Sequence, residues 1–299
     1  MSAETTSEAA PAKINLALHI TGQRADGYHL LDSIVAFASH GDLLTFSPAD
    51  RDGFGLAGRF GASLSAEAGG KDDNLVLKAR DLLRAALAAD GHVMEPVAIE
   101  LEKNLPVASG IGGGSADAAA TLRGLLRFWR ASLPPETLSA IALKLGADVP
   151  MCLESRPLRA RAIGERIDML GSIPRFALVL ANPLKSVSTP DIFRRLAKRD
   201  NPPIGTLPTS CDIAAWIAFL SGLRNDLEAP ARAIVPEIAS VSTALREAGS
   251  QLVRMSGSGA TCFGIFSDRE QAEKAALELE SRHPDWYVQA TETENGSAG

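Results

Sequence analysis

The pattern of apolar and polar residues predicts a chain that mixes strands and helices. Short runs with apolar side chains at every second position are typical of strands, and longer runs with apolar side chains three and four apart are typical of helices. Strands are predicted over residues 11–20, 40–46, 97–101, 158–162, 175–180, 252–255, 262–266 and 286–290. Helices are predicted from residue 75, from residue 115, over residues 136–145, from residue 189, and over residues 213–220, 237–248 and 269–281. Residues 1–10 are mostly polar or small, and we expect them to be disordered.

A glycine-rich segment joins one of these strands to a helix. Gly110, Gly112, Gly113 and Gly114 are followed directly by Ser115, which we expect to cap the helix. Glycine lets the backbone approach a ligand closely, and a helix N-terminus favours an anion. The segment therefore predicts a phosphate-binding loop, with a tight surface turn as the alternative.

The length and the succession of elements predict two domains of the α+β class. At 299 residues the chain is long enough for two cores, and we place the boundary near residue 160, giving domains over residues 1–160 and 161–299. The second half is compatible with a ferredoxin-like core, in which helices cover one face of an antiparallel sheet.

Composition and charge narrow the classes of function. The net charge of -6 and the pI of about 5.5 argue against nucleic acid and anionic lipid as partners. No apolar run approaches the ~18–20 residues of a membrane span, and the N-terminus lacks the apolar segment of a secretory signal. Cys152, Cys211 and Cys262 form no CxxC motif, so we expect reduced thiols rather than zinc ligands or disulfides. We expect a cytoplasmic protein, either a monomer or a weak homodimer, and local lysines and helix termini still allow a small anionic molecule as substrate.

The glycine-rich segment differs from two common nucleotide motifs. A Walker A loop needs a lysine directly after its last glycine, and the dinucleotide fingerprint needs a glycine where Ser115 stands. From Pro106 to Ala119 the segment instead resembles motif 2 of the GHMP kinases (galacto-, homoserine, mevalonate and phosphomevalonate kinases). The resemblance implies the two-domain GHMP kinase fold, with a ribosomal-protein-like first domain and a ferredoxin-like second domain. It also implies ATP and Mg2+ as cofactors and an alcohol as phosphate acceptor.

Two stretches resemble one branch of this family, which phosphorylates the 2-hydroxyl of a cytidyl diphosphate-linked polyol in isoprenoid precursor synthesis. The first, PAKINLAL, places Lys13 and Asn15 on one face of a strand, for which a solvated face is the alternative. The second, GQRADGYHLL, places Tyr28 and His29 after a hairpin turn; by pattern alone this pair is more typical of half-buried packing. The resemblance implies that Lys13 acts in catalysis, that Tyr28 stacks on cytosine and that His29 binds the edge of that base.

The same resemblance implies roles for residues elsewhere. LGADVP resembles the stretch with the catalytic aspartate, here Asp148, close to Lys13; by pattern alone Asp148 is an ordinary turn residue. SGSGA, at residues 256–260, resembles motif 3, which packs against the phosphate loop. The implied nucleotide-binding residues are Asn74, Lys103, Pro106, Ser109, Gly110, Gly112, Gly113, Gly114 and Ser115. The implied substrate-binding residues are Asn15, Tyr28, His29, Asp148, Thr189 and Phe193.

Several of these residues have structural alternatives. Asn74, or Asp73 before it, is also expected as a helix cap, as is Thr189. Lys103 is equally expected as a surface lysine without function, and Phe193 as a core residue. These alternatives stay open at the level of sequence.

Asp117 departs from the family pattern, because many relatives have Asn there. Ser115 and Asp117 are therefore the candidate Mg2+ ligands, with an extra charge in the first helical turn as the alternative role of Asp117.

Three rival functions differ from this hypothesis in identifiable ways. Another GHMP kinase, such as homoserine kinase, should lack the DGYH sequence. A non-catalytic ligand-binding member should have lost Lys13 or Asp148, and both are present. An RNA-binding role for the ribosomal-protein-like domain needs a basic stripe, which the acidic chain lacks.

Overall fold

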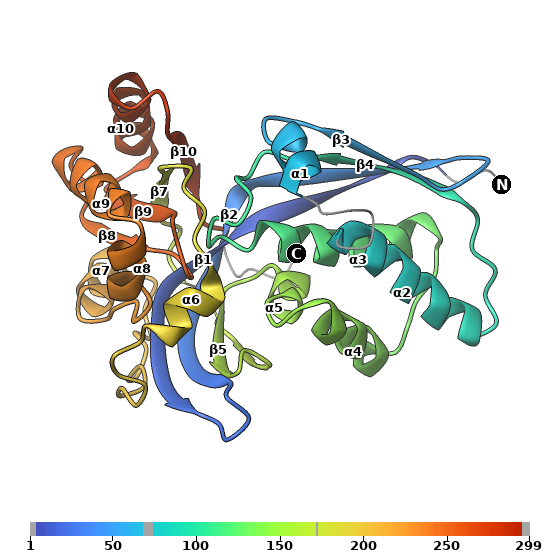
Figure 1. Cartoon of the computed structure of the whole chain (residues 1–299), viewed down its shortest axis with the longest axis horizontal. Helices are drawn as coiled ribbons and strands as arrows, with labels where there is room; N and C mark the ends of the chain where they lie inside the picture. Colours follow the sequence, from blue (N-terminus) through green and yellow to red (C-terminus); the bar gives the residue numbers. More distant parts are fainter. Residues whose placement is uncertain (1–3, 68–73, 172, 295–299) are drawn as a thin grey trace. The chain divides into compact units, whose positions relative to one another are not determined.

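Two long strands begin the chain in the computed structural model, which describes residues 4–67, 74–171 and 173–294. They are β1 (Thr6–Gln23) and β2 (His29–Pro48), which pair with each other (Figure 1). The predicted turn between them is confirmed, and Gly27 supplies its positive φ of 91°.

The expectation of disorder over residues 1–10 is wrong for the part that belongs to β1. These residues pair with β2, and the guanidinium of Arg123 adds bonds to Glu8 Oε1 over 2.7 Å and to the carbonyl of Ala9 over 3.0 Å. Residues 1–3 lie outside the described residues.

The chain passes back and forth between two compact units. Unit 1 contains residues 1–12, 41–107 and 112–154, and unit 2 contains residues 13–40, 108–111 and 155–299. The domain boundary that we placed near residue 160 stays a prediction.

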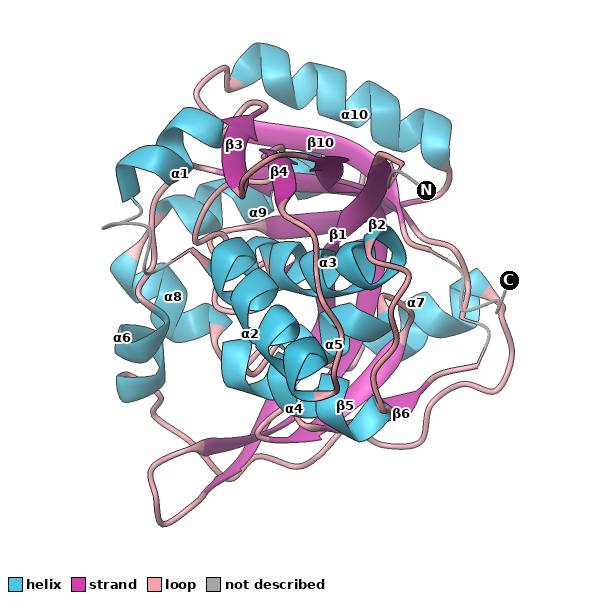
Figure 2. Ribbon diagram, turned by 90° about the vertical axis from the view of Figure 1, so that its right-hand side faces the viewer, coloured by secondary structure: helices cyan, strands magenta, loops and turns pink. Residues whose placement is uncertain are grey.

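In unit 1, β4 (Val97–Glu102) pairs antiparallel with Leu43–Pro48 of β2 and parallel with β3 (Gly53–Ala57). The helices are α1 (Gly61–Glu67), α2 (Leu75–Ala89), α3 (Gly113–Phe128), α4 (Pro135–Leu145) and α5 (Val149–Glu154). Helix α3 contacts α2, α4 and α5 (Figure 2). Small residues allow α3 to lie close to the sheet: a Cβ on Gly124 would come within 2.2 Å of the ring of Phe46.

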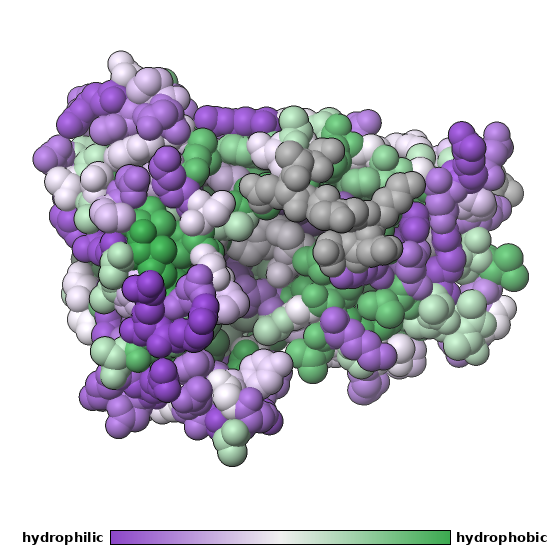
Figure 3. Space-filling view, viewed as in Figure 1, coloured by the Kyte–Doolittle hydropathy of each residue, from purple (hydrophilic) through white to green (hydrophobic). Residues whose placement is uncertain are grey.

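In unit 2, four antiparallel strands form a sheet in the order β10-β7-β9-β8. They are β7 (Ala177–Asn182), β8 (Leu252–Met255), β9 (Cys262–Phe266) and β10 (Tyr287–Glu292). Helices α9 (Glu237–Glu247) and α10 (Arg269–Arg282) contact this sheet and each other, and hydrophilic side chains cover the visible side of α10 (Figure 3). This strand order and these two helices confirm the predicted α+β class and ferredoxin-like core.

Other strands and helices of unit 2 lie outside this sheet, and α6 (Thr189–Arg194) carries the predicted substrate residues Thr189 and Phe193. They also include β5 (Leu158–Ala162), β6 (Arg166–Met169), α7 (Ile213–Ser221) and α8 (Glu228–Ile234). Strand β5 pairs with Leu31–Val35 of β2 and with β6. Within the described residues, no helix is long and apolar enough to cross a membrane.

Candidate active site

The glycine-rich segment leads into the N-terminus of α3, as predicted. Gly112 is the N-cap, with a left-handed φ of 65°, and its carbonyl accepts the first helical hydrogen bond from Ala116 N–H over 2.8 Å. The prediction that Ser115 caps the helix is wrong, because Ser115 already lies inside the first turn. The N–H groups of Gly113, Gly114 and Ser115 precede the first helical bond, and together with the dipole of a 16-residue helix they favour an anion.

The preceding loop residues, 108–111, belong to unit 2 and bind its SGSGA hairpin. The carbonyl of Ser109 accepts from Thr261 N–H over 3.1 Å, and the carbonyl of Gly110 accepts from Ser256 Oγ over 3.1 Å. Gly110 has a φ of 77°, and a Cβ there would lie 2.5 Å from the carbonyl oxygen of Ser256. The packing that the resemblance implied for SGSGA is therefore present.

Lys13 and Asn15 are buried side by side in unit 2. Each is 3% exposed, so the alternative of a solvated strand face is wrong. Lys13 Nζ donates to Asn15 Oδ1 over 2.9 Å, and the backbone N–H of Lys13 donates to the carbonyl of Ile111 over 2.9 Å. The first motif and the phosphate loop are thus joined directly.

Asn74 and Asp148 lie in unit 1, at the starts of two helices. Asn74 caps α2, since its Oδ1 accepts from Val76 N–H over 2.9 Å; Asp73 lies outside the described residues. Asp148 is half-buried and directly precedes α5. The closeness of Asp148 to Lys13 stays a prediction.

Lys103 is buried, which overturns its interpretation as a surface lysine. Its Nζ lies 2.5 Å from Asp42 Oδ2 and 2.6 Å from Asp117 Oδ2, and it is 2% exposed. Burial raises the pKa of Asp117, and the charge of Lys103 opposes that rise. A Cβ on Gly113 would lie 3.0 Å from Lys103 Nζ, so this buried triad (Lys103, Asp42, Asp117) is adjacent to the start of α3.

Asp42 is a buried residue beside the predicted phosphate loop that the sequence pattern did not single out. Its Oδ1 accepts from the backbone N–H groups of Asn104 and Leu105, over 2.6 and 2.8 Å, just before the phosphate loop. The sequence could have indicated that Asp42 is buried, because it lies on the same strand face as Leu44 and Phe46, which are fully buried.

His29 and Phe193 form the aromatic pair of the predicted base-binding region. Their ring centroids are 4.8 Å apart with an interplanar angle of 29°, whereas Tyr28 is 62% exposed. Burial, and secondly Arg199, lower the pKa of His29, which favours a neutral ring. All three residues belong to unit 2, whereas the predicted boundary near residue 160 places Tyr28 and Phe193 in different domains.

One alternative role for Thr189, as the cap of α6, is wrong. Ser188 is the N-cap, because its side chain accepts from Asp191 N–H. The hydroxyl of Thr189 instead lies 2.9 Å from that of Ser258 in the SGSGA hairpin.

Comparison with known proteins matches both halves of the chain. The profile described as "GHMP kinases N terminal domain" matches residues 74–156, and "GHMP kinases C terminal" matches residues 212–285. The chain belongs to the GHMP kinase family. Two curated relatives, from Rhizobium johnstonii and Agrobacterium fabrum, are named 4-diphosphocytidyl-2-C-methyl-D-erythritol kinase. The first is 61% identical, covering 99% of this chain and 95% of the relative; the second is 59% identical, covering 97% of each.

Solved structures of GHMP kinases agree with this assignment. The crystal structure of 4-(cytidine 5'-diphospho)-2C-methyl-D-erythritol kinase matches with a TM-score of 0.77 and 32% identity, covering 96% of this chain and 99% of that one. A homoserine kinase from Cytophaga hutchinsonii, at 18% identity and a TM-score of 0.63, shares the fold.

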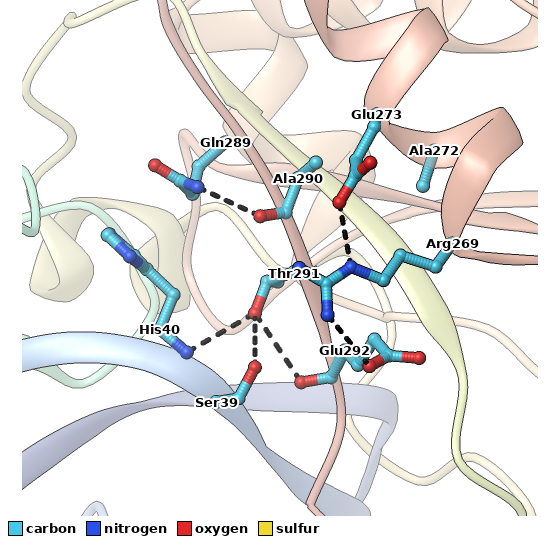
Figure 4. Close-up of a pocket in the computed structure, with 9 residues that line it drawn as sticks. All are labelled: Ser39, His40, Arg269, Ala272, Glu273, Gln289, Ala290, Thr291 and Glu292. Atoms are coloured by element: carbon cyan, nitrogen blue, oxygen red, sulfur yellow. Dashed lines mark hydrogen bonds and ion pairs between the residues drawn. The ribbon is translucent and has the colours of Figure 1, made fainter.

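A cavity of about 220 Å³ in unit 2 of this GHMP kinase is lined by residues other than those predicted for the site. Its polar groups bind one another: Thr291 Oγ1 lies 3.1 Å from Ser39 Oγ, and Arg269 Nε donates to Glu273 over 2.7 Å (Figure 4). We assign no catalytic role to this cavity.

Proposed function

We propose that this GHMP kinase transfers the γ-phosphate of ATP to the 2-hydroxyl of 4-diphosphocytidyl-2-C-methyl-D-erythritol, in the non-mevalonate route to isoprenoid precursors. The main support is the identity of 61% over 99% of the chain to a kinase named for this substrate. The aromatic region of His29 and Phe193, beside the exposed Tyr28, adds support because a cytosine ring binds well to aromatic faces.

The residues of the site supply the parts that phosphate transfer needs. We propose that the loop from Ser109 to Ser115 and the start of α3 hold the phosphates. Asp148 accepts the proton of the attacking hydroxyl, and Lys13 stabilises the charge that develops.

We propose Mg2+ as the metal that accompanies ATP, with Ser115 and Asp117 as its protein ligands. Both supply oxygen, which Mg2+ prefers, and Asp117 Oδ1 is buried without a hydrogen-bond partner among the described residues. Those residues contain no group of three or more His, Cys, Asp or Glu side chains able to hold a metal ion, so the phosphates would complete its coordination. Bound Mg2+ would neutralise phosphate charge.

An ADP-release assay over a panel of alcohols tests the proposed substrate. We expect turnover with the cytidyl substrate and none with homoserine, mevalonate or phosphomevalonate, and mass spectrometry should find one added phosphate on the 2-hydroxyl. Turnover with homoserine instead would refute the substrate assignment. An absence of ADP release with every alcohol, in folded protein that binds ATP, would favour a non-catalytic member.

A further inference from the structure

Ser33 lies at the centre of a buried chain of hydrogen bonds that ends at Lys13. Asn15 Nδ2 donates to Ser33 Oγ over 2.8 Å, and Ser33 Oγ donates to the carbonyl of Ala17 over 2.7 Å. Asn15 Oδ1 accepts from Lys13 Nζ over 2.9 Å. Lys13, Asn15 and Ser33 are each at most 3% exposed, so bulk water is not a ready substitute for these bonds.

The direction of each bond follows from the chemistry at the two ends of the chain. A backbone carbonyl only accepts hydrogen bonds, and a lysine ammonium only donates them. The hydroxyl of Ser33 therefore donates its proton to the carbonyl of Ala17, and a lone pair of the hydroxyl oxygen accepts from the NH2 group of Asn15. The amide of Asn15 must then present its oxygen to Lys13.

The backbone of Asn15 is held independently of its side chain. Its N–H donates to Ser256 Oγ over 3.0 Å, and Ser256 Oγ donates to the carbonyl of Gly110 in the phosphate loop. With the main chain held, the remaining freedom of Asn15 lies in the rotation of its side chain. Ser33 is placed to stop that rotation.

We propose that Ser33 is a positioning residue for phosphate transfer: it fixes the amide of Asn15 and, through that amide, the ammonium of Lys13. The inference rests on the proposed function, in which Lys13 serves the reaction. Without the hydroxyl of Ser33, the NH2 group of Asn15 loses its acceptor, and the amide is free to rotate away from the orientation in which its oxygen accepts from Lys13. The ammonium then leaves the position in which it stabilises developing charge.

Steady-state kinetics of Ser33→Ala, Ser33→Thr and Ser39→Ala test this role. Ser39, an exposed serine of the same strand, is the control, because its hydroxyl lies 3.1 Å from Thr291 Oγ1 and has no bond to Asn15. We expect Ser33→Ala to lower kcat about tenfold while the KM for ATP changes by less than about twofold. Ser33→Thr, which keeps a hydroxyl, should retain most of kcat, and Ser39→Ala should match the wild type.

A double-variant cycle separates positioning from a general loss of folding. In a Lys13→Met background, adding Ser33→Ala should leave kcat unchanged, because the group that Ser33 positions is gone. If Ser33→Ala does not fold, Ser33→Cys preserves the size of the side chain with a weaker hydrogen bond, and its kcat should still fall. Wild-type kcat in the folded Ala or Cys variant, equal losses in the Ala and Thr variants, or a further fall of kcat in the Lys13→Met background would overturn the inference.

If the proposed function is wrong, the wild type itself does not release ADP with the cytidyl substrate, which distinguishes this failure from a failure of the role of Ser33. The same ratios of kcat are then measured with the alcohol that it does phosphorylate, because the bonds from Ser33 to Lys13 do not depend on the identity of the substrate.

Discussion

Lys103 Nζ lies 2.6 Å from Asp117 Oδ2, and neither side chain is more than 4% exposed. The ammonium also binds Asp42, so one buried cation serves two buried carboxylates. Its placement next to the start of α3 makes the triad a support for the phosphate loop.

Replacing the cation of this triad should destabilise the fold. Lys103→Met leaves two buried carboxylates together, and we expect a loss of ~3–5 kcal/mol in the free energy of unfolding, measured in urea. Asp117→Asn leaves Lys103 paired with Asp42 and should cost less. The double variant Lys103→Met/Asp117→Asn should recover part of the loss. If Lys103→Met weakens ATP binding at unchanged stability, Lys103 is a nucleotide contact and not a structural cation.

Removing either proposed catalytic group should lower kcat while the protein stays folded. We expect Asp148→Asn and Lys13→Met each to reduce kcat by ~10²–10⁴-fold, the usual contribution of a positioned acid or base. Lys274→Met, on the exposed side of α10, is the control and should be fully active. Near-normal turnover of purified Asp148→Asn would remove Asp148 as the base.

Gly112 should matter more for ATP binding than for folding. Its left-handed φ of 65° means that Gly112→Val adds backbone strain of ~1–2 kcal/mol as well as a side chain at the phosphate loop. Gly91→Val is the matched control, since Gly91 has a φ of 85° and open space around its Cβ position. Both variants should lower Tm by similar amounts, and only Gly112→Val should raise the Kd for ATP at least tenfold. Equal ATP affinity in the two variants would show that Gly112 serves only the turn.

Tyr28 should affect the KM for the cytidyl substrate without affecting stability. Because Tyr28 is 62% exposed, Tyr28→Ala should leave Tm unchanged. Losing one stacking surface costs ~1–3 kcal/mol, which raises this KM by roughly five- to 150-fold. Phe193→Ala should raise the KM and also lower Tm, because Phe193 packs against the core of unit 2. An unchanged KM in Tyr28→Ala would exclude the ring from cytosine binding.

Asp52 makes stability depend on pH in the acid range. Hydrogen bonds from Arg84 and from Val97 N–H lower the pKa of Asp52 from 3.8 to about 2. The folded state therefore favours the carboxylate, so this stabilisation is complete above pH 3.8 and is lost as the pH falls toward 2. Urea unfolding of Asp52→Asn should show a flatter decline than the wild type between these values. Parallel curves for the two proteins would contradict the assignment.

Local pattern was sufficient for elements with clear breaks at both ends. Strands β5, β8 and β9 have the predicted bounds, since each is a run of four or five alternating or mostly apolar residues flanked by turn-forming residues. The six-residue α5 and the seven-residue α8 were missed, because each contains a proline and is too short to show helical periodicity.

The candidate site likewise contains parts that local sequence predicts and parts that it does not. The phosphate loop is a dense local motif, and its place before α3 was predicted from the residues themselves. Asp42 and Lys103 are 61 residues apart in the chain, and Asn15 and Ser33 are 18 apart, so their pairing arises only when strands meet. A lone serine on a strand has no sequence signature, and the role of Ser33 emerges from distances alone.

Because the chain alternates between the two compact units, the choice of junctions is constrained in a chimera made from two related kinases. The chain passes from one unit to the other after Ala12, His40, Val107, Ile111 and Glu154. A chimera joined once near residue 160 keeps β1 and β2 from one parent and the ferredoxin-like sheet from the other. The backbone bond from Glu294 N–H to the carbonyl of Phe37 and the bridge between Leu18 and Asn225 would then join residues of different ancestry. Exchange of the whole of unit 2 therefore requires a junction at every one of those crossings, placed so that the short segment 108–111 comes from the same parent as residues 13–40 and 155–299.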